Sequence, residues 1–320
     1  MTAAQNSFRT TLKLYRSIMS PKARKRTRNR KLKPQIYPIA IETSYRKQIS
    51  DITDKFITAV TPYIQRFLSA NVRTRTDSVD SDLDAMMQML DDELILIYGT
   101  NALSAGNLGN LLSTIAEKIL GRNSAFMQSQ IEIAAGTPIT LDMSWWPETK
   151  ALWEQENYKL IKNLSTDYIS KINGVITNGI QNGATIEEMT ASIQKVSDSI
   201  KGYRARYIAR DQVSRLNALA TRKQAESVGI ANFFWTTAGD EKVRGNPSGK
   251  YPKAIPSHYI MDGTLCNYSN SELYSLDLGK TWIPRPVKAP RTNPGISYLC
   301  RCLATLSWNS FLTELDMEIE

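Results

Sequence analysis

The stretch ANFFWTTAGDEKVRG, residues 231–245, marks the point at which a helical chain gives way to strands and loops. Three consecutive aromatic residues, Phe233, Phe234 and Trp235, predict a strand. The glycine and small polar residues that follow are typical of a turn. Seven of the 13 prolines lie further on, between residues 247 and 294. Polar and apolar residues partly alternate over residues 298–307, which predicts a second strand.

Upstream of this stretch, apolar residues recur at the three- and four-residue steps of amphipathic helices. Helices are expected over residues 1–19 and from about residue 41 to residue 70. A further helix runs through Leu108 and is expected to end near Gly121. Residues 77–93, which are acidic and rich in methionine, indicate either a solvated helix start or a mobile connector.

Three more helices are expected between residue 146 and the strand. The second of them begins at a capping box, in which Thr185 and Glu188 satisfy each other's backbone amides. The third covers about residues 203–226 and ends at Gly229. The predicted fold class is a mostly α N-terminal and central helical body with a small, loop-rich α+β C-terminal module.

The net charge of +9 is concentrated at the N-terminal end of the chain. Residues 1–50 hold 13 of the 40 lysines and arginines but only 1 of the 31 acidic residues, a local charge of +12, and the rest of the chain carries −3. Eight side chains within residues 22–33 are basic and are expected to be extended and solvated, because like charges cannot pack together. They are Lys22, Arg24, Lys25, Arg26, Arg28, Arg30, Lys31 and Lys33.

Basic side chains at this density bind phosphates by releasing counterions, and they need no fixed geometry to do so. The segment therefore predicts non-specific contact with double-stranded DNA. Tyr37 is the only aromatic residue near the cluster, so base stacking is not indicated. The alternatives are a solubilising tail or an arm that docks on an acidic protein.

A second basic pattern lies in the predicted helix over residues 203–226. Arg206 and Arg210 are i,i+4 neighbours, so their charges repel unless an anion or an acidic group lies between them. Asp211 cannot neutralise both arginines from an adjacent helical position. The pattern predicts either an anion contact or arginines that pair with acidic residues elsewhere in the chain.

The single histidine, His258, and the three cysteines, Cys266, Cys300 and Cys302, together make a tetrahedral set of zinc ligands. Against this, a Cys-x-Cys on a regular strand places both thiols on one face with little freedom to converge. Free cysteines also pack well as small apolar residues. We expect reduced and mostly packed sulfurs, and the sequence leaves metal binding open.

His258 with Cys266 or Cys300 could also form a Cys-His nucleophile pair, with Asp240 or Asp262 orienting the imidazole. No spacing in the sequence shows that these residues meet, and no glycine-rich phosphate loop is present. We therefore expect no enzymatic activity and no cofactor.

The longest aliphatic run, residues 94–97, is far too short to span a membrane, and no apolar segment of a secretory signal follows the basic N-terminus. No membrane partner is expected. The odd number of cysteines fits a reducing compartment.

Residues 146–307 resemble the phage Mu F-like, or phage head morphogenesis, family of minor head proteins. The resemblance rests on the order of several short motifs rather than on any one of them. A Gly183-x-x-x-Glu-Glu-Met helix precedes the helix with Arg206, Arg210, Asp211 and Gln212, and a Trp-Thr-Thr strand follows. Then come Asp240, Arg244, His258, Asp262, Gly263 and the closing Cys300-Arg301-Cys302.

The resemblance implies a minor capsid protein of a tailed double-stranded DNA phage, present in few copies inside the head. Such proteins associate with the portal during procapsid assembly, contact the major capsid or scaffolding protein, and in some cases leave with the genome. It implies localisation in the virion, and in the bacterial host cytoplasm during assembly. The alternatives are a genome-delivered enzyme using a Cys-His or metal site, and a cellular adaptor with a basic tail.

The expected domain organisation has four parts. Residues 1–38 form a basic arm that is disordered or partly helical, and residues 39–145 form a helical region. Residues 146–307 form the domain that resembles the phage family, and residues 308–320 form a C-terminal tail.

Overall fold

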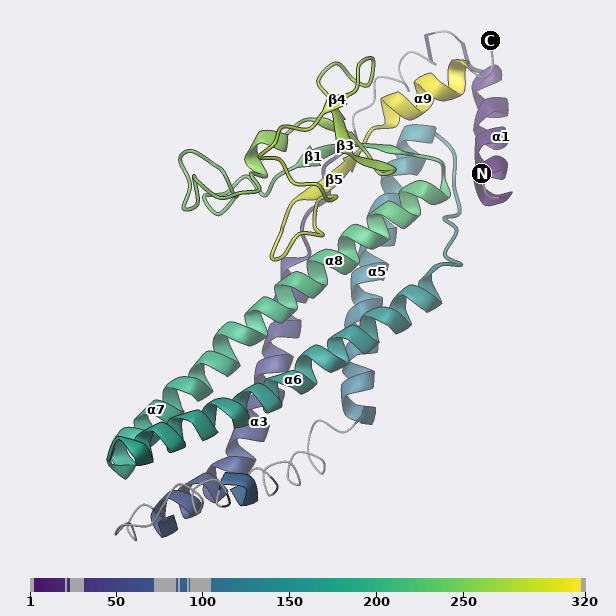
Figure 1. Ribbon diagram of the computed structural model, residues 1–320. Helices are drawn as coiled ribbons and strands as arrows, with labels where there is room; N and C mark the ends of the chain where they lie inside the picture. Colours follow the sequence, from purple (N-terminus) through teal and green to yellow (C-terminus); the bar gives the residue numbers. More distant parts are fainter. Residues whose placement is uncertain are drawn as a thin grey trace. The chain divides into compact units, whose positions relative to one another are not determined.

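The computed structural model describes residues 3–20, 22–23, 32–71, 85, 87–90, 92 and 105–317. Its helices are α1 (Ala3–Ser17), α3 (Ile39–Asn71), α5 (Ala105–Ala135), α6 (Trp146–Gln181), α7 (Ile186–Asp198), α8 (Ala205–Ser227) and α9 (Trp308–Met317) (Figure 1). The π-helical turn η1 (Ser199–Arg204) joins α7 to α8, and the short 3-10 turn η2 is Tyr259–Met261. The strands are β1 (Asn232–Thr236), β2 (Leu265–Asn267), β3 (Asn270–Ser275), β4 (Ile283–Pro284) and β5 (Leu303–Leu306). The predicted fold class is confirmed.

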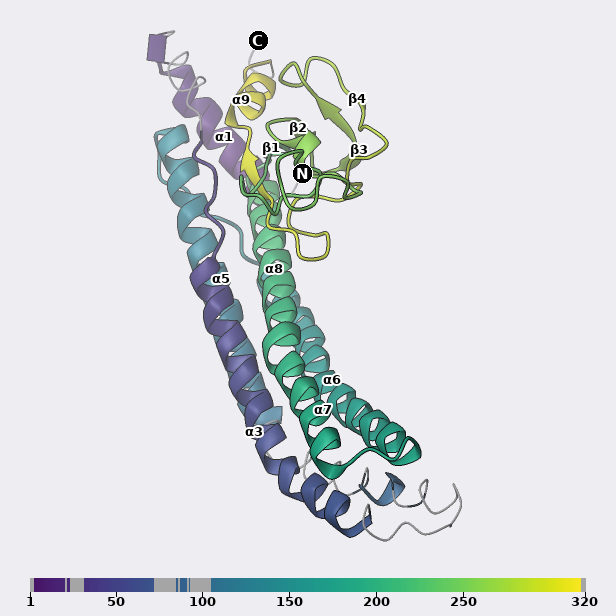
Figure 2. The same ribbon diagram turned by 90° about the vertical axis from the view of Figure 1, so that its left-hand side faces the viewer.

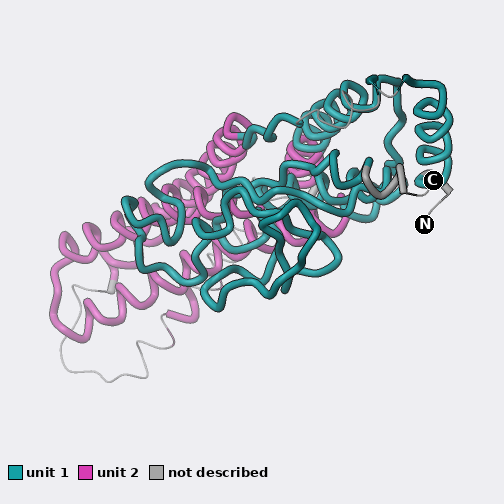
Figure 3. The backbone as a smooth tube through the Cα atoms, turned by 90° about the horizontal axis from the view of Figure 1, so that it is seen from above, with its two compact units in different colours: residues 1–38, 117–149, 213–320 teal, residues 39–116, 150–212 magenta. Residues whose placement is uncertain are grey.

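The chain divides into two compact units (Figure 3). Unit 1 comprises residues 1–38, 117–149 and 213–320, and unit 2 comprises residues 39–116 and 150–212. The boundaries fall inside α5, α6 and α8, so each of these helices contributes residues to both units.

The core of unit 2 is built on one face of α3, as the sequence spacing predicts. Ile49 and Val60 are fully buried, and so is nearly all of Phe56. The Phe56 ring meets Tyr168 of α6 edge to face, with ring centroids 5.9 Å apart. α3 also contacts α7 and η1, so both elements contribute to the packing of unit 2.

Two predictions about helix ends have opposite outcomes. The capping box at the start of α7 is confirmed: Thr185 Oγ1 accepts the Glu188 amide at 3.1 Å, and Glu188 Oε2 accepts the Thr185 amide at 2.9 Å. The predicted helix end near Gly121 is wrong, because α5 continues to Ala135. A glycine inside a helix costs only about 1 kcal/mol, and burial of residues such as Ile131 further along α5 outweighs that cost.

The sheet of unit 1 is antiparallel throughout, with strand order β4-β3-β2-β1-β5. β1 is paired on both sides, and the side chains of Phe233 and Trp235 are completely buried. The strand predicted over residues 298–307 is shorter than expected, because β5 begins only at Leu303. Leu299 has a φ of 55°, in the left-handed region that a regular strand excludes.

α1 belongs to unit 1 and packs against α9 (Figure 2). The ring of Phe8 stacks on that of Phe311 with centroids 6.1 Å apart, and Leu12 is 1% exposed. Residues 3–17 are therefore anchored in the core of unit 1 rather than hanging free of it.

Most of the acidic segment 77–93 lies outside the described residues; the parts that are described, residues 85, 87–90 and 92, are helical. None of the described helices combines the length and apolar character needed to cross a membrane.

The sheet determines which distant residues meet. In the β1–β5 pairing, Thr236 lies opposite Leu303. The loop that leaves β1 and the segment that enters β5 therefore lie at the same end of these two strands. This arrangement brings residues 237–264 beside residues 299–302.

Candidate functional site

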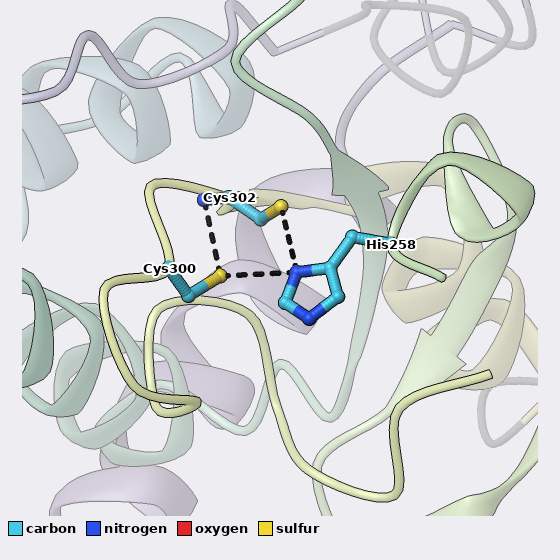
Figure 4. A group of neighbouring side chains, drawn as sticks. All are labelled: His258, Cys300 and Cys302. Atoms are coloured by element: carbon cyan, nitrogen blue, oxygen red, sulfur yellow. Dashed lines mark hydrogen bonds between the residues drawn. The ribbon is translucent and has the colours of Figure 1, made fainter. Parts of the chain in front are cut away.

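The imidazole of His258 and the thiols of Cys300 and Cys302 form a compact cluster in unit 1 (Figure 4). His258 Nδ1 lies 3.3 Å from Cys300 Sγ and 3.4 Å from Cys302 Sγ. The three potential ligand atoms lie within 4.8 Å of one another, and each residue is at most 4% exposed. The expectation that the two thiols cannot converge is wrong, because residues 300–302 precede β5 and are not in a regular strand.

Backbone amides fix the position of the Cys300 sulfur. Cys300 Sγ accepts the amide of Gly295 at 3.4 Å and the amide of Cys302 at 3.3 Å. Gly295 has a φ of 83°, and a Cβ there would lie 2.7 Å from Cβ of Ala218. Only glycine fits this close approach, so Gly295, which the sequence indicates as a turn residue, also supports the site.

The two thiols are electrostatically unequal. A hydrogen bond from Cys302 holds the pKa of Cys300 well below its usual value, and His258 and the Gly295 amide contribute in the same direction against burial. That same hydrogen bond, together with burial, raises the pKa of Cys302 well above its usual value. Cys300 is therefore the more readily ionised of the two thiols.

The third cysteine, Cys266, does not belong to this cluster. It lies on β2, opposite Phe233, and burial raises the pKa of its thiol. The four-ligand zinc set considered from the sequence is therefore reduced to three residues. Cys266 also matches no motif of the family that the sequence resembles, and burial does not separate it, since all three cysteines are buried.

The polar residues of the C-terminal motifs join the loop after β1 to the segment before β5. Asp240 Oδ2 accepts Arg301 Nη2 at 2.5 Å, and Arg244 donates to the carbonyl of Tyr298. Burial raises the pKa of Asp240, but the hydrogen bond and charge of Arg301 outweigh it and leave that pKa lowered. These contacts hold the site in shape.

Asp262 and Gly263 form the turn that leads into β2. Asp262 Oδ1 accepts the Thr237 amide at 2.8 Å, and Gly263 has a φ of 74°. In the described part of the chain, neither Asp240 nor Asp262 is hydrogen-bonded to His258, whose Nε2 is buried without a partner. The imidazole is therefore oriented by the two sulfurs rather than by a carboxylate.

A small cavity of about 40 Å³ opens beside the cluster. His258, Cys300 and Cys302 line it together with three cationic side chains, Lys242, Arg244 and Arg301. This volume exceeds the roughly 10–15 Å³ that one ordered water needs, but it is far below that of a small-molecule site.

The arginine motif of α8 lies in unit 2, where its members serve packing and pairing. Arg210 Nε lies 3.3 Å from Glu42 Oε1, so one of the two arginines has an acidic partner. Arg206 lies over the rings of Tyr203 and Tyr207, 5.4 and 5.7 Å from their centroids. The sequence predicts either an acidic partner or an anion contact for these arginines. Arg210 has an acidic partner within the chain, whereas Arg206 is exposed and could still contact an anion.

Asp211 and Gln212 are buried, and Gln212 joins a chain of internal hydrogen bonds. Its Oε1 accepts Asn157 Nδ2 at 2.9 Å, while Asn157 Oδ1 accepts the hydroxyl of Tyr45 at 2.8 Å. The Gln212 carbonyl accepts Trp153 Nε1 at 3.2 Å. A satisfied buried network of this kind specifies how α3, α6 and α8 align within unit 2.

An open groove of about 580 Å³ lies on unit 2. Four basic side chains line it, together with Asp51 and the aromatic ring of Tyr203: Arg46, Lys47, Lys201 and Arg206. Lys201 is paired with Asp54 at 2.9 Å, but Arg46 and Lys47 have no ion pair among the described residues. Sequence reasoning missed this groove because its two halves lie on α3 and at the η1–α8 junction, far apart in the chain.

Most of the predicted DNA-binding arm lies outside the described residues: Arg24, Lys25, Arg26, Arg28, Arg30 and Lys31. Lys22 and Lys33 are described, and both are exposed. The Lys33 amide donates to Gln130 Oε1 at 2.9 Å, which fixes the C-terminal end of the arm on α5.

Comparison with known proteins relates part of the C-terminal half to one family. Residues 170–305 match the family described as "Phage Mu protein F like protein". The match over these residues agrees with the resemblance that the order of motifs indicates.

Two curated relatives carry no assigned activity. The chain is 29% identical over 147 residues to an uncharacterized protein of Haemophilus influenzae, which covers 46% of this chain and 27% of that protein. It is 26% identical over 156 residues to an uncharacterized protein of Methanocaldococcus jannaschii, which covers 49% of this chain and 20% of that protein. The alignments thus span less than a third of either relative. No solved structure matches the chain.

Proposed function

We propose that this chain is a non-enzymatic minor head protein of a tailed double-stranded DNA phage, and that it contacts packaged DNA inside the head. The family match over residues 170–305 carries the first part of the proposal. The charge of +12 on residues 1–50 carries the second, because the rest of the chain has a net charge of −3. Such segregation suits a protein that touches a polyanion with one part and protein subunits with another.

The basic groove of unit 2 supports the DNA contact independently of the arm. Arg46 and Lys47 have no acidic partner among the described residues, and Arg206 is held in place by two tyrosine rings. An ordered row of cations can bind backbone phosphates without reading bases. The proposed DNA contact is therefore non-specific. The arm supplies most of the positive charge, and the groove supplies cations at fixed positions.

The portal protein is the proposed principal partner, and the major capsid or scaffolding protein is the second. The family resemblance supports the identity of these partners. In this proposal the chain assembles with the head in the host cytoplasm, stays in the head interior, and can leave with the genome.

One structural observation favours the alternative of a genome-delivered enzyme. His258 Nδ1 and Cys300 Sγ are 3.3 Å apart, which fits a thiolate and its base. The cluster is nevertheless buried, and the cavity beside it holds about 40 Å³. A peptide, nucleotide or sugar substrate needs a much larger opening, so we favour a structural role for these residues.

Salt-dependent DNA binding tests the proposed function. The full chain would be titrated with labelled duplexes of two unrelated sequences, and fluorescence anisotropy would be measured over a series of salt concentrations. If the eight basic residues of segment 22–33 each contact a phosphate, the slope of log affinity against log salt should be about −7, and equal for both sequences.

The variants for this test replace basic side chains with glutamine and keep the length of the chain. Deleting residues 1–38 would strip Leu12 and Phe8 from the core of unit 1, so substituting all eight arm residues with glutamine is the cleaner change. The control variant carries glutamine at Lys253, Lys280 and Lys288, which are exposed in unit 1. A slope that flattens in the arm variant alone supports the proposal; a slope that the arm variant leaves unchanged refutes the role of the arm.

A further inference from the structure

We propose that His258, Cys300 and Cys302 bind one Zn²⁺ ion that ties the loop after β1 to the segment before β5. Zinc would be held by His258 Nδ1 and two thiolates, with a solvent molecule as the fourth ligand. The inference is independent of the DNA contact, since no residue of the arm or of the basic groove takes part.

The distances already match tetrahedral coordination. With Zn–S bonds near 2.3 Å and Zn–N bonds near 2.0–2.1 Å, tetrahedral angles place nitrogen and sulfur roughly 3.5 Å apart. His258 Nδ1 lies 3.3 and 3.4 Å from the two sulfurs. The nitrogen and each sulfur need to separate by only about 0.2 Å to reach this spacing.

The charges around the cluster favour thiolates. Cys300 Sγ already accepts two backbone amides, an arrangement that stabilises a negatively charged sulfur. The cations Lys242, Arg244 and Arg301 line the adjoining cavity and also favour deprotonated cysteine. Two thiolates neutralise the 2+ charge of zinc, so the loaded site carries no net charge to bury.

The cavity supplies the fourth position. Among the described residues, no further histidine, cysteine, aspartate or glutamate belongs to the ligand group, and Cys266 is not part of it. The cavity of about 40 Å³ is lined by all three ligands and has room for a water molecule on the open side of the ion. Two soft sulfur ligands and one imidazole select zinc over magnesium or calcium, which require oxygen ligands.

Binding changes the protonation of the site in a defined way. Zinc takes the lone pair of Nδ1 and leaves the imidazole proton on Nε2. It also binds both cysteines as thiolates, so protons that the thiols carry are released to solvent. Zinc affinity should therefore fall as pH is lowered.

The test uses the full chain, reduced, stripped with a chelator and then incubated with zinc chloride alone. Bound metal is counted by elemental mass spectrometry after gel filtration. We expect one zinc per chain, and at least about tenfold weaker binding in Cys300→Ser, Cys302→Ser and His258→Asn. Cys266→Ser is the matched control, because it removes a buried cysteine of the same unit and should leave zinc binding unchanged.

A measurement on the unaltered chain covers the case in which a variant fails to fold. Alkylation mapped by mass spectrometry should find Cys300 and Cys302 protected by zinc, with reactivity restored by chelator, while Cys266 responds to neither. Cobalt(II) in place of zinc should give the absorption bands of tetrahedral sulfur coordination. No bound zinc in the unaltered chain, or zinc retained by all three ligand variants, would overturn the proposal, as would equal alkylation with and without zinc.

Discussion

Replacing Gly295 with alanine should destabilise unit 1 by about 2–5 kcal/mol, from two separate causes. A φ of 83° lies in the left-handed region, which costs an L-residue about 1–2 kcal/mol. The new Cβ would also lie 2.7 Å from Cβ of Ala218 and 3.3 Å from the backbone oxygen of Ser214, and overpacking of this kind costs about 1–3 kcal/mol. Any shift of the backbone that relieves the clash moves the amide that Cys300 Sγ accepts.

Gly263→Ala separates the two causes. Gly263 has a φ of 74°, but nothing lies within 4 Å of where its Cβ would be. This variant should therefore lose only the conformational part, about 1–2 kcal/mol. The difference between the two variants measures the close approach of Gly295 to α8.

Denaturant unfolding followed by tryptophan fluorescence is the suitable assay, because five of the six tryptophans lie in unit 1. The free energy of unfolding would be compared for the unaltered chain and the two variants under reducing conditions. Equal losses for Gly295→Ala and Gly263→Ala would refute the reasoning, since they would mean that the loop before Cys300 is not pressed against α8.

Three further predictions concern other parts of the chain. Tyr45→Phe should cost unit 2 about 1–2 kcal/mol in urea unfolding, because it leaves the buried amide oxygen of Asn157 without its donor; an unchanged midpoint would count against the buried network. The folded-state pKa of Asp240 is lowered, so its stabilising contribution is complete above its unfolded pKa of about 4 and is lost as the pH falls through the lower folded value. Asp240→Asn should therefore flatten the dependence of unfolding midpoint on pH below about 4, and an identical profile would contradict the pairing. Arg46→Gln with Lys47→Gln should make the salt slope of DNA binding shallower by about 2, and no change would remove the groove from the account.

Features set by neighbouring residues could be predicted from the sequence. The capping box of Thr185 and Glu188 needs only a three-residue spacing, and the buried stripe of α3 needs only helical periodicity. β1 could be recognised because its aromatic residues are consecutive and turn residues follow them. In each case the local pattern and the tertiary environment favour the same structure.

Features set by tertiary contacts could not be predicted from the sequence. Gly121 predicts a helix end, but the packing of α5 on both sides of it overrides this weak preference. The approach of His258 to Cys300 and Cys302 depends on the register that sets Thr236 opposite Leu303, and on a left-handed residue at Leu299. No spacing of cysteines and histidine in the chain encodes either condition, so the sequence left four candidate ligands where the structure groups three.

The basic groove illustrates the same limit for charged residues. Arg46 and Lys47 follow no motif, and Lys201 is separated from them by most of unit 2. The arm could be recognised because its charges are contiguous, whereas the groove exists only once α3 and η1 have packed together.

The most direct test of the central claim, a minor head protein inside the phage particle, is quantitative mass spectrometry of purified particles. The amount of this chain would be compared with portal and major capsid subunits, before and after genome release. We expect a few copies per portal ring, protected from external protease until the head is opened. Absence of the chain from both mature and immature particles would contradict it.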